Sequence, residues 1–404
     1  MKHRRPPGPI QRHPVLSVLL AMVAVVAMGV GAGADGRTTT ARLGPAAESP
    51  GSVAPRVESG AVGRPIAGAG RMTARMAPAD TAPAGGRATP ADCTLSAHLV
   101  PGCGLLWGVA PGAYTGLAAS RALRQFEEKT GRPADILHVY HRGDELFPTA
   151  DEIAAARDPG HRRLLLVNWK VAWGTTWAAV AAGGADARID RLADHLRGHY
   201  PERFFFALHH EPENDVRTAP GSGMTSRDYA AMFRHTVQRL RARGVTNAVF
   251  VMVYMAYEQW CVQPWFGDLW PGDDVVDWVG FDPYVFAQPG GYGHGDFGHL
   301  VDRTSNPARW PGFYTWATRT HPGKPLMVAE WGVFEYPADP AQKAWIFSTV
   351  APQLRRYPAI RALVYFDSPA TPKGDTRPDS SGAALTEYRR LAESSLFTVG
   401  VSQP

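Results

Sequence analysis

The sequence predicts a single (β/α)8 barrel that occupies residues 93–404 of the 404-residue chain. From residue 103 onward, short apolar runs alternate with amphipathic stretches, which is the pattern of repeated strand–helix units. All 12 Trp, 13 Tyr and 16 Phe lie after residue 92. Only this part of the chain therefore has the large side chains that a packed core uses.

Each expected strand is a run of four to seven mostly apolar residues, bounded by residues that favour turns. In chain order, the eight expected strands are Leu105–Ala110, Ile136–Tyr140, Leu164–Trp169, Phe204–Leu208, Ala248–Tyr254, Val275–Phe281, Leu326–Ala329 and Ala362–Phe366.

An amphipathic helix is expected after most of these strands, and Gly or Pro marks several helix ends, as at Gly131 and Gly244. The expected helices are Ser120–Thr130, Asp151–Arg157, Ile189–His199, Ser226–Arg243, Arg309–Thr318, Pro340–Arg356 and Leu385–Ser394. A doubly wound open sheet is the alternative fold. It would place Gly-x-Gly-x-x-Gly after the first strand, whereas Gly102, Gly104 and Gly108 lack that spacing.

The first 92 residues are expected to precede the folded domain rather than join it. Residues 1–34 have a basic start, an apolar run and small residues at Ala32–Ala34, which is typical of a signal peptide. An uncleaved anchor is the alternative, because Val15–Ala34 is nearly long enough to span a bilayer. Residues 35–92 are rich in Ala, Gly and Pro and are expected to be a disordered linker. We therefore expect a secreted protein that associates with the cell wall or membrane, if at all, through its N-terminus.

The three cysteines all follow the expected linker. In an oxidising compartment, a bridge between Cys93 and Cys103 would fix the entry to the domain and leave Cys261 free. A bridge from Cys261 to either of the others remains open, because spacing alone does not decide the pairing.

The net charge of +5 comes from the N-terminal part of the chain. Residues 1–92 carry a surplus of six positive charges, so residues 93–404 have a net charge of −1. A neutral domain has no electrostatic footprint for a polyanion, and we expect no nucleic-acid partner. The histidines form no His-Glu-x-x-His pattern, so we expect no metal and no other cofactor.

Polar residues at the ends of the expected strands indicate where chemistry occurs, because barrel active sites lie at the C-terminal ends of the strands. His209, His210 and Glu211 follow the fourth strand, and Glu330 follows the seventh. Two carboxyl groups on opposite strands suit glycoside hydrolysis, in which one donates a proton while the other attacks the anomeric carbon. Glu213 is the alternative for the first of these groups.

Other side chains near the strand ends are candidates for binding a sugar. Tyr284 follows the sixth strand, and His138 lies on the second strand beside Tyr140. Tryptophans offer flat faces that suit the C–H faces of sugar rings, although many tryptophans only pack in the core. Those near strand ends are Trp169, Trp173, Trp177, Trp260, Trp265 and Trp331. We predict that substrate contacts His210, Tyr284, Trp331, Trp169 and His138.

Three motifs on their proper strands resemble glycoside hydrolase family 26. They are His210-Glu211, the stretch Asp277–Tyr284 with the sequence Asp-Trp-Val-Gly-Phe-Asp-Pro-Tyr, and Ala329-Glu330-Trp331-Gly332. The resemblance implies a retaining (β/α)8 glycosidase in which Glu211 is the acid/base and Glu330 the nucleophile. It further implies that Tyr284 donates a hydrogen bond to the nucleophile, and that His210 positions the acid or contacts the substrate.

The resemblance implies an endo-acting hydrolase of β-linked polysaccharide, with β-1,4-mannan as the first expected substrate. The sequence departs from the mannanases after the acid/base, because Pro212-Glu213-Asn214 stand where those enzymes have Met-Asn-Gly. Mixed-linkage β-glucan and β-xylan are therefore alternative substrates. The alternative of another class is a carbohydrate-binding barrel without turnover. We expect a monomer whose partner is the polysaccharide itself.

Overall fold

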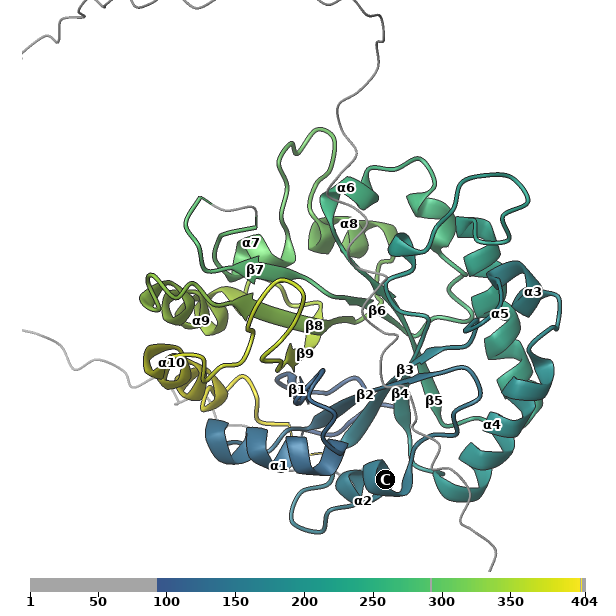
Figure 1. Cartoon of the computed structure of the whole chain (residues 1–404), viewed down its shortest axis with the longest axis horizontal. Helices are drawn as coiled ribbons and strands as arrows, with labels where there is room; N and C mark the ends of the chain where they lie inside the picture. The colour runs from purple at the N-terminus through teal and green to yellow at the C-terminus, as the bar shows by residue number, and fades with distance from the viewer. Residues whose placement is uncertain (1–92, 291–292, 400, 402–404) are drawn as a thin grey trace, which may run out of the picture. The chain divides into compact units, whose positions relative to one another are not determined.

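The computed structural model describes residues 93–290, 293–399 and 401, and this part of the chain contains the predicted barrel. Eight parallel strands of the described residues pair in the order β1-β2-β3-β4-β5-β6-β8-β9, and β9 pairs with β1 to close the sheet (Figure 1). The strands are β1 (Leu106–Ala110), β2 (Ile136–Arg142), β3 (Leu164–Lys170), β4 (Phe204–Leu208), β5 (Ala248–Tyr254), β6 (Trp278–Phe281), β8 (Leu326–Phe334) and β9 (Ile360–Phe366). The expected signal peptide and linker lie outside the described residues.

The strand bounds differ most from the sequence expectation at the sixth and seventh expected strands. β6 begins at Trp278, three residues later than expected, and β8 continues to Phe334, five residues further. An additional short strand, β7 (Tyr284–Phe286), pairs with the extension of β8, so that Tyr284 lies opposite Gly332. The β8–β9 pairing is irregular between Val328 and Trp331, but β8 continues past this point, so Glu330 lies within a strand instead of at its end.

The helices of the described residues surround the barrel (Figure 1). They are α1 (Ala119–Thr130), α2 (Ala150–Ala156), α3 (Trp177–Ala181), α4 (Asp186–His199), α5 (Ser226–Ala242), α6 (Glu258–Cys261), α7 (Phe297–Val301), α8 (Phe313–Thr320), α9 (Ala341–Leu354) and α10 (Gly382–Ala392). The short helices α3, α6 and α7 were not expected from the sequence. None of the helices in the described ranges is both long and apolar enough to cross a membrane.

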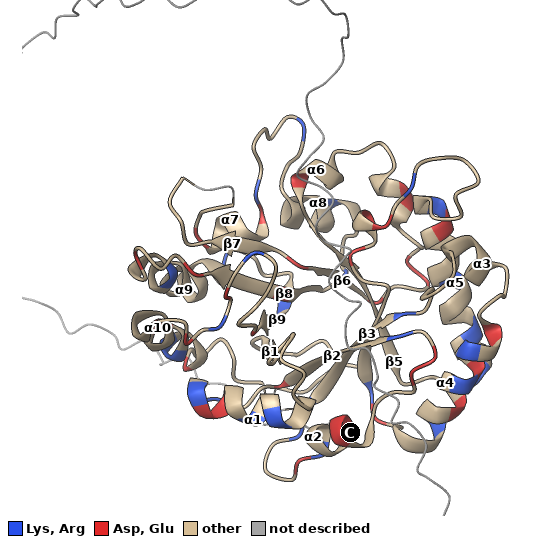
Figure 2. Ribbon diagram, viewed as in Figure 1, with Lys and Arg blue, Asp and Glu red and all other residues tan. Residues whose placement is uncertain are grey.

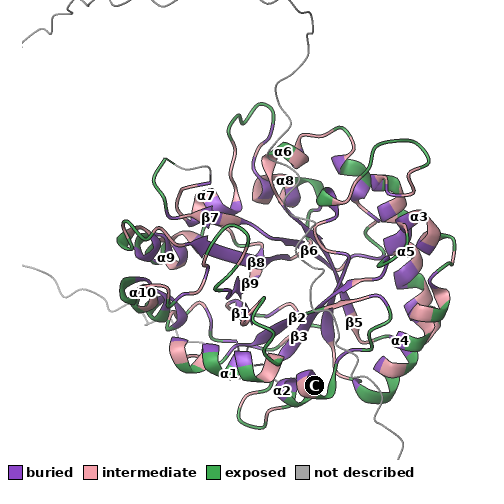
Figure 3. Ribbon diagram, viewed as in Figure 1, coloured by how far each residue is buried: buried purple, intermediate pink, exposed green. Residues whose placement is uncertain are grey.

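Two hydrophobic cores hold the barrel together, and Figure 3 shows the buried strands inside the partly exposed helices. Side chains such as Phe205, Val251 and Met327 fill the barrel interior. The larger core lies between the strands and the helices, and it includes Trp107 and Tyr388, whose ring centroids are 5.3 Å apart. Layers of bulky side chains of this kind make the barrel a packed core rather than a pore.

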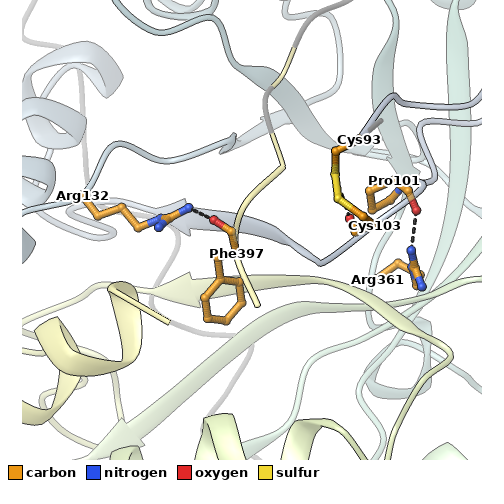
Figure 4. Close-up of a disulfide and its surroundings, with 6 residues drawn as sticks. All are labelled: Cys93, Pro101, Cys103, Arg132, Arg361 and Phe397. Atoms are coloured by element: carbon orange, nitrogen blue, oxygen red, sulfur yellow. Dashed lines mark hydrogen bonds between the residues drawn. A yellow bond between two sulfur atoms is a disulfide. The ribbon is translucent and has the colours of Figure 1, made fainter. Parts of the chain in front are cut away.

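The segments just before β1 and after α10 close the N-terminal end of the barrel. Cys93 and Cys103 form a disulfide, which is one of the pairings left open by the sequence, and Cys261 is a buried free thiol. Close by, the Arg361 guanidinium donates to the Pro101 carbonyl oxygen (Figure 4). Leu99, Val399 and Val401 pack into the same core as the barrel interior. The opposite, C-terminal end is thereby left as the open mouth.

Charged residues lie mainly on the outer faces of the helices, as Figure 2 shows for α4 and α5. The Arg239 guanidinium on α5 donates two hydrogen bonds of 2.7 Å to the Asp190 carboxylate on α4. His235 lies 2.6 Å from Asp186 on the same pair of helices. These ion pairs are partly exposed, so each contributes about 1 kcal/mol or less to stability.

We predict that Gly280→Ala destabilises the barrel. A Cβ atom at this position in β6 would lie 2.7 Å from Val253 and 2.9 Å from Val251, inside the packed interior. Overpacking of this kind lowers the free energy of unfolding by about 1–3 kcal/mol. The matched control is Gly198→Ala on the exposed face of α4, where a Cβ meets nothing within 4 Å and should raise stability slightly. Chemical denaturation measures both, and equal stability of the two variants would contradict the interior packing described.

Candidate active site

Glu211 and Glu330 reach the mouth of the barrel from strands on opposite sides of the closed sheet. Glu211 follows β4, and Glu330 is the fifth residue of β8. The two carboxyl groups interact electrostatically, since the charge of Glu330 raises the pKa of Glu211. The two predicted catalytic residues are therefore brought into one site.

Two tyrosine hydroxyls hold the buried Glu330 carboxylate, which is only 6% exposed. Tyr140 donates to Oε1 at 2.7 Å, and Tyr284 donates to Oε2 at 2.7 Å. The hydrogen bond expected from Tyr284 is thus present, and Tyr140 supplies a second one. Burial, and then the charge of Glu330, raise the pKa of both tyrosines well above the usual value, so both stay protonated donors.

The same contacts decide the ionisation of Glu330. Burial raises the pKa of Glu330 to about 7, and the hydrogen bonds from Tyr140 and Tyr284 oppose that rise. Hydrogen bonds to the charged form of a carboxyl group favour ionisation. Glu330 therefore ionises although it is buried, and its negative charge acts on the neighbouring groups.

Glu211 lies at the bend where the chain leaves β4. Its backbone is left-handed, with φ of 52°, and His209 two residues earlier has the same φ of 52°. Two such residues cost about 1–3 kcal/mol each, and strain of this kind concentrates at functional sites. Burial, then the charges of Glu330 and Glu213, raise the pKa of Glu211 to about 8. Of the two acids, Glu211 is the one that keeps its proton.

A hydrogen-bond network holds the strained bend in place. The Trp177 indole N–H donates to Nδ1 of His209 at 3.3 Å, and Nε2 of His209 lies 2.8 Å from the Asp215 carboxylate. Burial lowers the pKa of His209, so the ring is neutral and Nε2–H is the donor. Lys170 at the end of β3 lies 3.5 Å from the same carboxylate. Asp215, which directly follows Pro212-Glu213-Asn214, thus belongs to an anchor for Glu211.

Glu213 is part of this anchor and does not face the mouth. The side chain is 1% exposed, and its Oε1 accepts a hydrogen bond from the Met255 backbone N–H at 2.9 Å. Burial raises the pKa of Glu213 to about 7. The alternative assignment of Glu213 as the acid is therefore wrong, because a carboxyl group fixed beneath the bend cannot reach a substrate oxygen.

The neighbouring Asp282 is completely buried. Burial, then the charges of Glu330, Glu211 and Glu213, raise the pKa of Asp282 well above the usual value. Asp282 is therefore neutral, so Glu330 carries the negative charge of the site.

The two predicted histidines have different positions. His138 is 2% exposed and lies behind Tyr140, with Nδ1 at 3.3 Å from the tyrosine hydroxyl oxygen. The prediction that His138 contacts substrate is therefore wrong, because the ring supports Tyr140 from beneath. His210 is less buried, and its ring centroid lies 5.7 Å from that of Tyr140. His210 therefore remains a candidate for contact with a ligand.

The tryptophans predicted to bind substrate are core residues. Trp169 is 0% and Trp331 is 1% exposed, and Trp331 packs against Phe347 and Tyr365 between the barrel and the helices. Neither has a face open to a sugar ring, so both predictions are wrong. β8 extends past Glu330 and is irregular between Val328 and Trp331, so Trp331 packs in the outer core while Glu330 contacts the two tyrosines. Trp173, by contrast, is 46% exposed.

Two exposed aromatic side chains follow the C-terminal ends of β1 and β3. Trp173 stacks on the Arg142 guanidinium, 4.4 Å from the ring centroid, at the ends of β3 and β2. Tyr114 follows β1 and is 54% exposed. Burial of its hydroxyl and the charges of Glu330 and Glu211 raise the pKa of Tyr114, which places it above the carboxyl pair. Neither residue was among the predicted binding residues.

A cavity of about 560 Å³ lies beside the site but contains neither Glu211 nor Glu330. Its walls include Lys129 and Asp367, whose charged groups are 2.9 Å apart. The remaining lining residues include Gly112, Arg377 and Asp379. Asp367 ends an apolar run but serves here as a structural ion-pair acid. No group of three His, Cys, Asp or Glu residues in the described ranges is arranged to hold a metal ion.

Comparison with known proteins places this geometry among glycosidases. No protein-family profile matches the chain. Endoglucanase H of Acetivibrio thermocellus is 26% identical over 295 residues, which are 70% of this chain and 30% of that protein. A β-1,3-xylanase from a Vibrio species is 30% identical over 151 residues, which are 37% of this chain and 28% of that protein. The chain thus matches less than a third of the length of these relatives.

A solved structure shares the fold. The catalytic domain of a family 26 endo-β-1,4-mannanase from a Bacillus species is 15% identical and superimposes with a TM-score of 0.51, over 73% of this chain and 87% of that one. This likeness shows the barrel fold. The chain resembles glycoside hydrolase family 26.

We predict that replacing both tyrosines, Tyr140→Phe with Tyr284→Phe, raises the pKa of Glu330. Each hydrogen bond to a charged group favours the ionised form by an amount that corresponds to about one to two pKa units. Carbon-13 NMR titration of glutamate carboxyl groups in the full chain measures the change. Tyr314→Phe is the control, because that hydroxyl contacts the Ala359 backbone N–H at the closed end of the barrel. An unchanged pKa in the double variant would refute the assigned contacts.

Proposed function

We propose that this protein is a retaining glycoside hydrolase that cleaves β-linked polysaccharide at internal bonds. The observation that carries the proposal is the opposite protonation of two carboxyl groups in one buried site. Two tyrosines favour the ionised form of Glu330, while burial and the charge of Glu330 favour the protonated form of Glu211. A retaining glycosidase needs this division between an ionised nucleophile and a protonated acid.

In the first step, one Glu330 carboxylate oxygen attacks the anomeric carbon and the bond from that carbon to the leaving oxygen breaks. Glu211 transfers its proton to the leaving oxygen and becomes ionised. In the second step, Glu211 takes a proton from water, and the water oxygen displaces Glu330 from the anomeric carbon. Two inversions retain the configuration. Both carboxyl groups return to their starting states.

The surrounding side chains support each step. Each Glu330 oxygen accepts one tyrosine hydrogen bond, so each keeps a lone pair for attack. When Glu211 loses its proton, the nearby charges of Lys170 and Lys373 stabilise the carboxylate, since both lower the pKa of Glu211. The exposed Trp173 and Tyr114 offer apolar faces to sugar rings on the open side of the site.

The proposed substrate is a β-glycan, and three polymers lead the candidates. The family resemblance puts β-1,4-mannan first. The relatives found by sequence are named endoglucanase and β-1,3-xylanase, which adds β-glucan and β-1,3-xylan. A reducing-sugar assay of the full chain on these polymers, with galactomannan and β-1,4-xylan included, identifies the substrate. Binding to a polymer without any turnover would favour the carbohydrate-binding barrel instead.

We also propose that the enzyme is exported and acts as a monomer. The disulfide between Cys93 and Cys103 supports export, since such bonds persist in oxidising compartments. Accumulation of an unprocessed chain inside the cell would contradict export.

We predict that Glu330→Ala removes nearly all turnover. Glu211→Ala should lower the rate on a polysaccharide far more than the rate on an aryl glycoside. Loss of a general acid lowers the rate on a polysaccharide by about 10²–10⁴-fold. An aryl glycoside with a good leaving group needs no proton and should lose far less. Glu213→Gln is the matched control, because glutamine can still accept from the Met255 backbone N–H. Wild-type rates for Glu330→Ala, or equal losses on both substrates for Glu211→Ala, would refute the roles.

The pH dependence of kcat/KM follows from the same two groups. Activity should rise as Glu330 ionises, with a pKa of about 7, and fall as Glu211 loses its proton, with a pKa of about 8. The bell-shaped curve should lose its alkaline limb in Glu211→Ala on an aryl glycoside. Rates that keep this limb in the variant would show that another group is the acid.

A further inference from the structure

Two segments meet above the carboxyl pair, and neither was singled out by the sequence. The Lys373 ammonium donates a hydrogen bond to the Tyr257 hydroxyl at 2.9 Å and lies 4.8 Å from the centroid of that ring. Lys373 belongs to the segment between β9 and α10, and Tyr257 to the segment between β5 and α6. In the closed sheet, β6 and β8 stand between β5 and β9. The contact therefore bridges the mouth on the side of Glu330.

Lys373 lies in a hydrogen-bonded loop that runs from Ser368 to Thr376. At its base, Thr376 N–H donates to the Ser368 carbonyl at 2.9 Å, and Ser368 N–H donates to the Thr376 hydroxyl oxygen at 3.1 Å. At its tip, Thr371 and Gly374 exchange two backbone hydrogen bonds of 3.1 Å. This tight turn fixes the backbone next to Lys373, so the side chain extends from a defined point.

Tyr257 is held just as firmly on the other side. Its carbonyl oxygen accepts from the Trp260 backbone N–H at 2.9 Å, in the turn that begins α6. The next residue, Glu258, accepts hydrogen bonds from the backbone N–H and the hydroxyl of Ser305 at 2.8 and 2.5 Å. Two anchored segments therefore meet through the side chains of Lys373 and Tyr257.

Tyr257 also lies close to a side chain that holds Glu330. Tyr257 and Tyr284 line one cavity of about 10 Å³, which is the room of a single water molecule. Tyr284 is a hydrogen-bond donor to Glu330, so this cavity borders the site. The charge of Lys373 also reaches Glu211, whose pKa it lowers. The contact thus lies against both halves of the carboxyl pair.

We propose that Lys373 and Tyr257 form a clasp that sets how a polysaccharide enters the cleft. The inference rests on the proposed function. While the clasp is closed, its contact joins the segments after β5 and β9 across the mouth, so a chain end or a short chain enters most easily. A polymer cut in its interior must lie across the whole mouth, and the clasp must open for it. The clasp therefore determines the share of internal cuts.

The clasp is suited to opening, because it joins the two segments through an amine and a neutral hydroxyl. No carboxylate of the described residues forms an ion pair with Lys373. A single contact of this kind shifts an equilibrium by roughly fivefold. The closed state is therefore favoured without being locked.

The test compares Tyr257→Phe and Lys373→Met with the wild-type full chain on the polymer that the panel identifies. The ratio of viscosity loss to new reducing ends reports the share of internal cuts. This ratio should rise by roughly fivefold or less in Tyr257→Phe. It should rise at least as much in Lys373→Met. Tyr257→Phe retains the lysine charge near Glu211, so its change reports the clasp alone. Lys373→Met provides a second reading if Tyr257→Phe folds poorly. Tyr314→Phe, at the closed end of the barrel, should leave the ratio unchanged.

Hydrolysis of an aryl glycoside separates the outcomes. Variants that cut it while the viscosity ratio stays at the wild-type value would overturn the clasp and leave the proposed function standing. A wild-type chain that cuts neither the polymers nor the aryl glycoside would overturn the proposed function, and the clasp with it.

Discussion

The interaction on which the rest depends is the pair of tyrosine hydroxyls that hold the Glu330 carboxylate. A buried carboxyl group resists ionisation, and here two hydrogen bonds of 2.7 Å oppose that resistance. Once Glu330 carries the charge, Glu211 and Asp282 are driven to keep their protons. One residue thus becomes the anion of the site and its neighbours become neutral acids.

The fold supplies what this arrangement needs. Tyr284 and Glu330 lie on the paired strands β7 and β8, and Tyr140 reaches Glu330 from β2, which β1 and β9 separate from β8 in the closed sheet. Glu211, in contrast, stands on a strained bend, and the bend is retained by His209 and its partners. The disulfide and the packed interior close the far end of the barrel, which leaves the mouth as the side where a polymer can bind. Rigid strands thus carry the proposed nucleophile, and an anchored loop carries the proposed acid.

Sequence patterns predicted the barrel well because its strands are continuous apolar runs, and β4 and β5 have the expected bounds. Strand ends marked by polar residues located Glu211 and Glu330. The pattern failed where a functional residue interrupts a strand, as β8 continues past Glu330 and turns Trp331 into the core. Tyr140 lies two residues after His138, and this alternation is the signal that both point inward. Contacts between distant loops, such as Lys373 with Tyr257, leave no mark in local sequence.

The central claim is that Glu330 forms a covalent bond with the sugar, and trapping that bond tests it most directly. A 2-deoxy-2-fluoro glycoside with a good leaving group slows the second step more than the first, so the glycosyl-enzyme accumulates. Peptide mapping by mass spectrometry then locates the added sugar. The account predicts one adduct, on the peptide that contains Glu330. An adduct on Glu211 or Glu213, or turnover with no adduct at all, would contradict it.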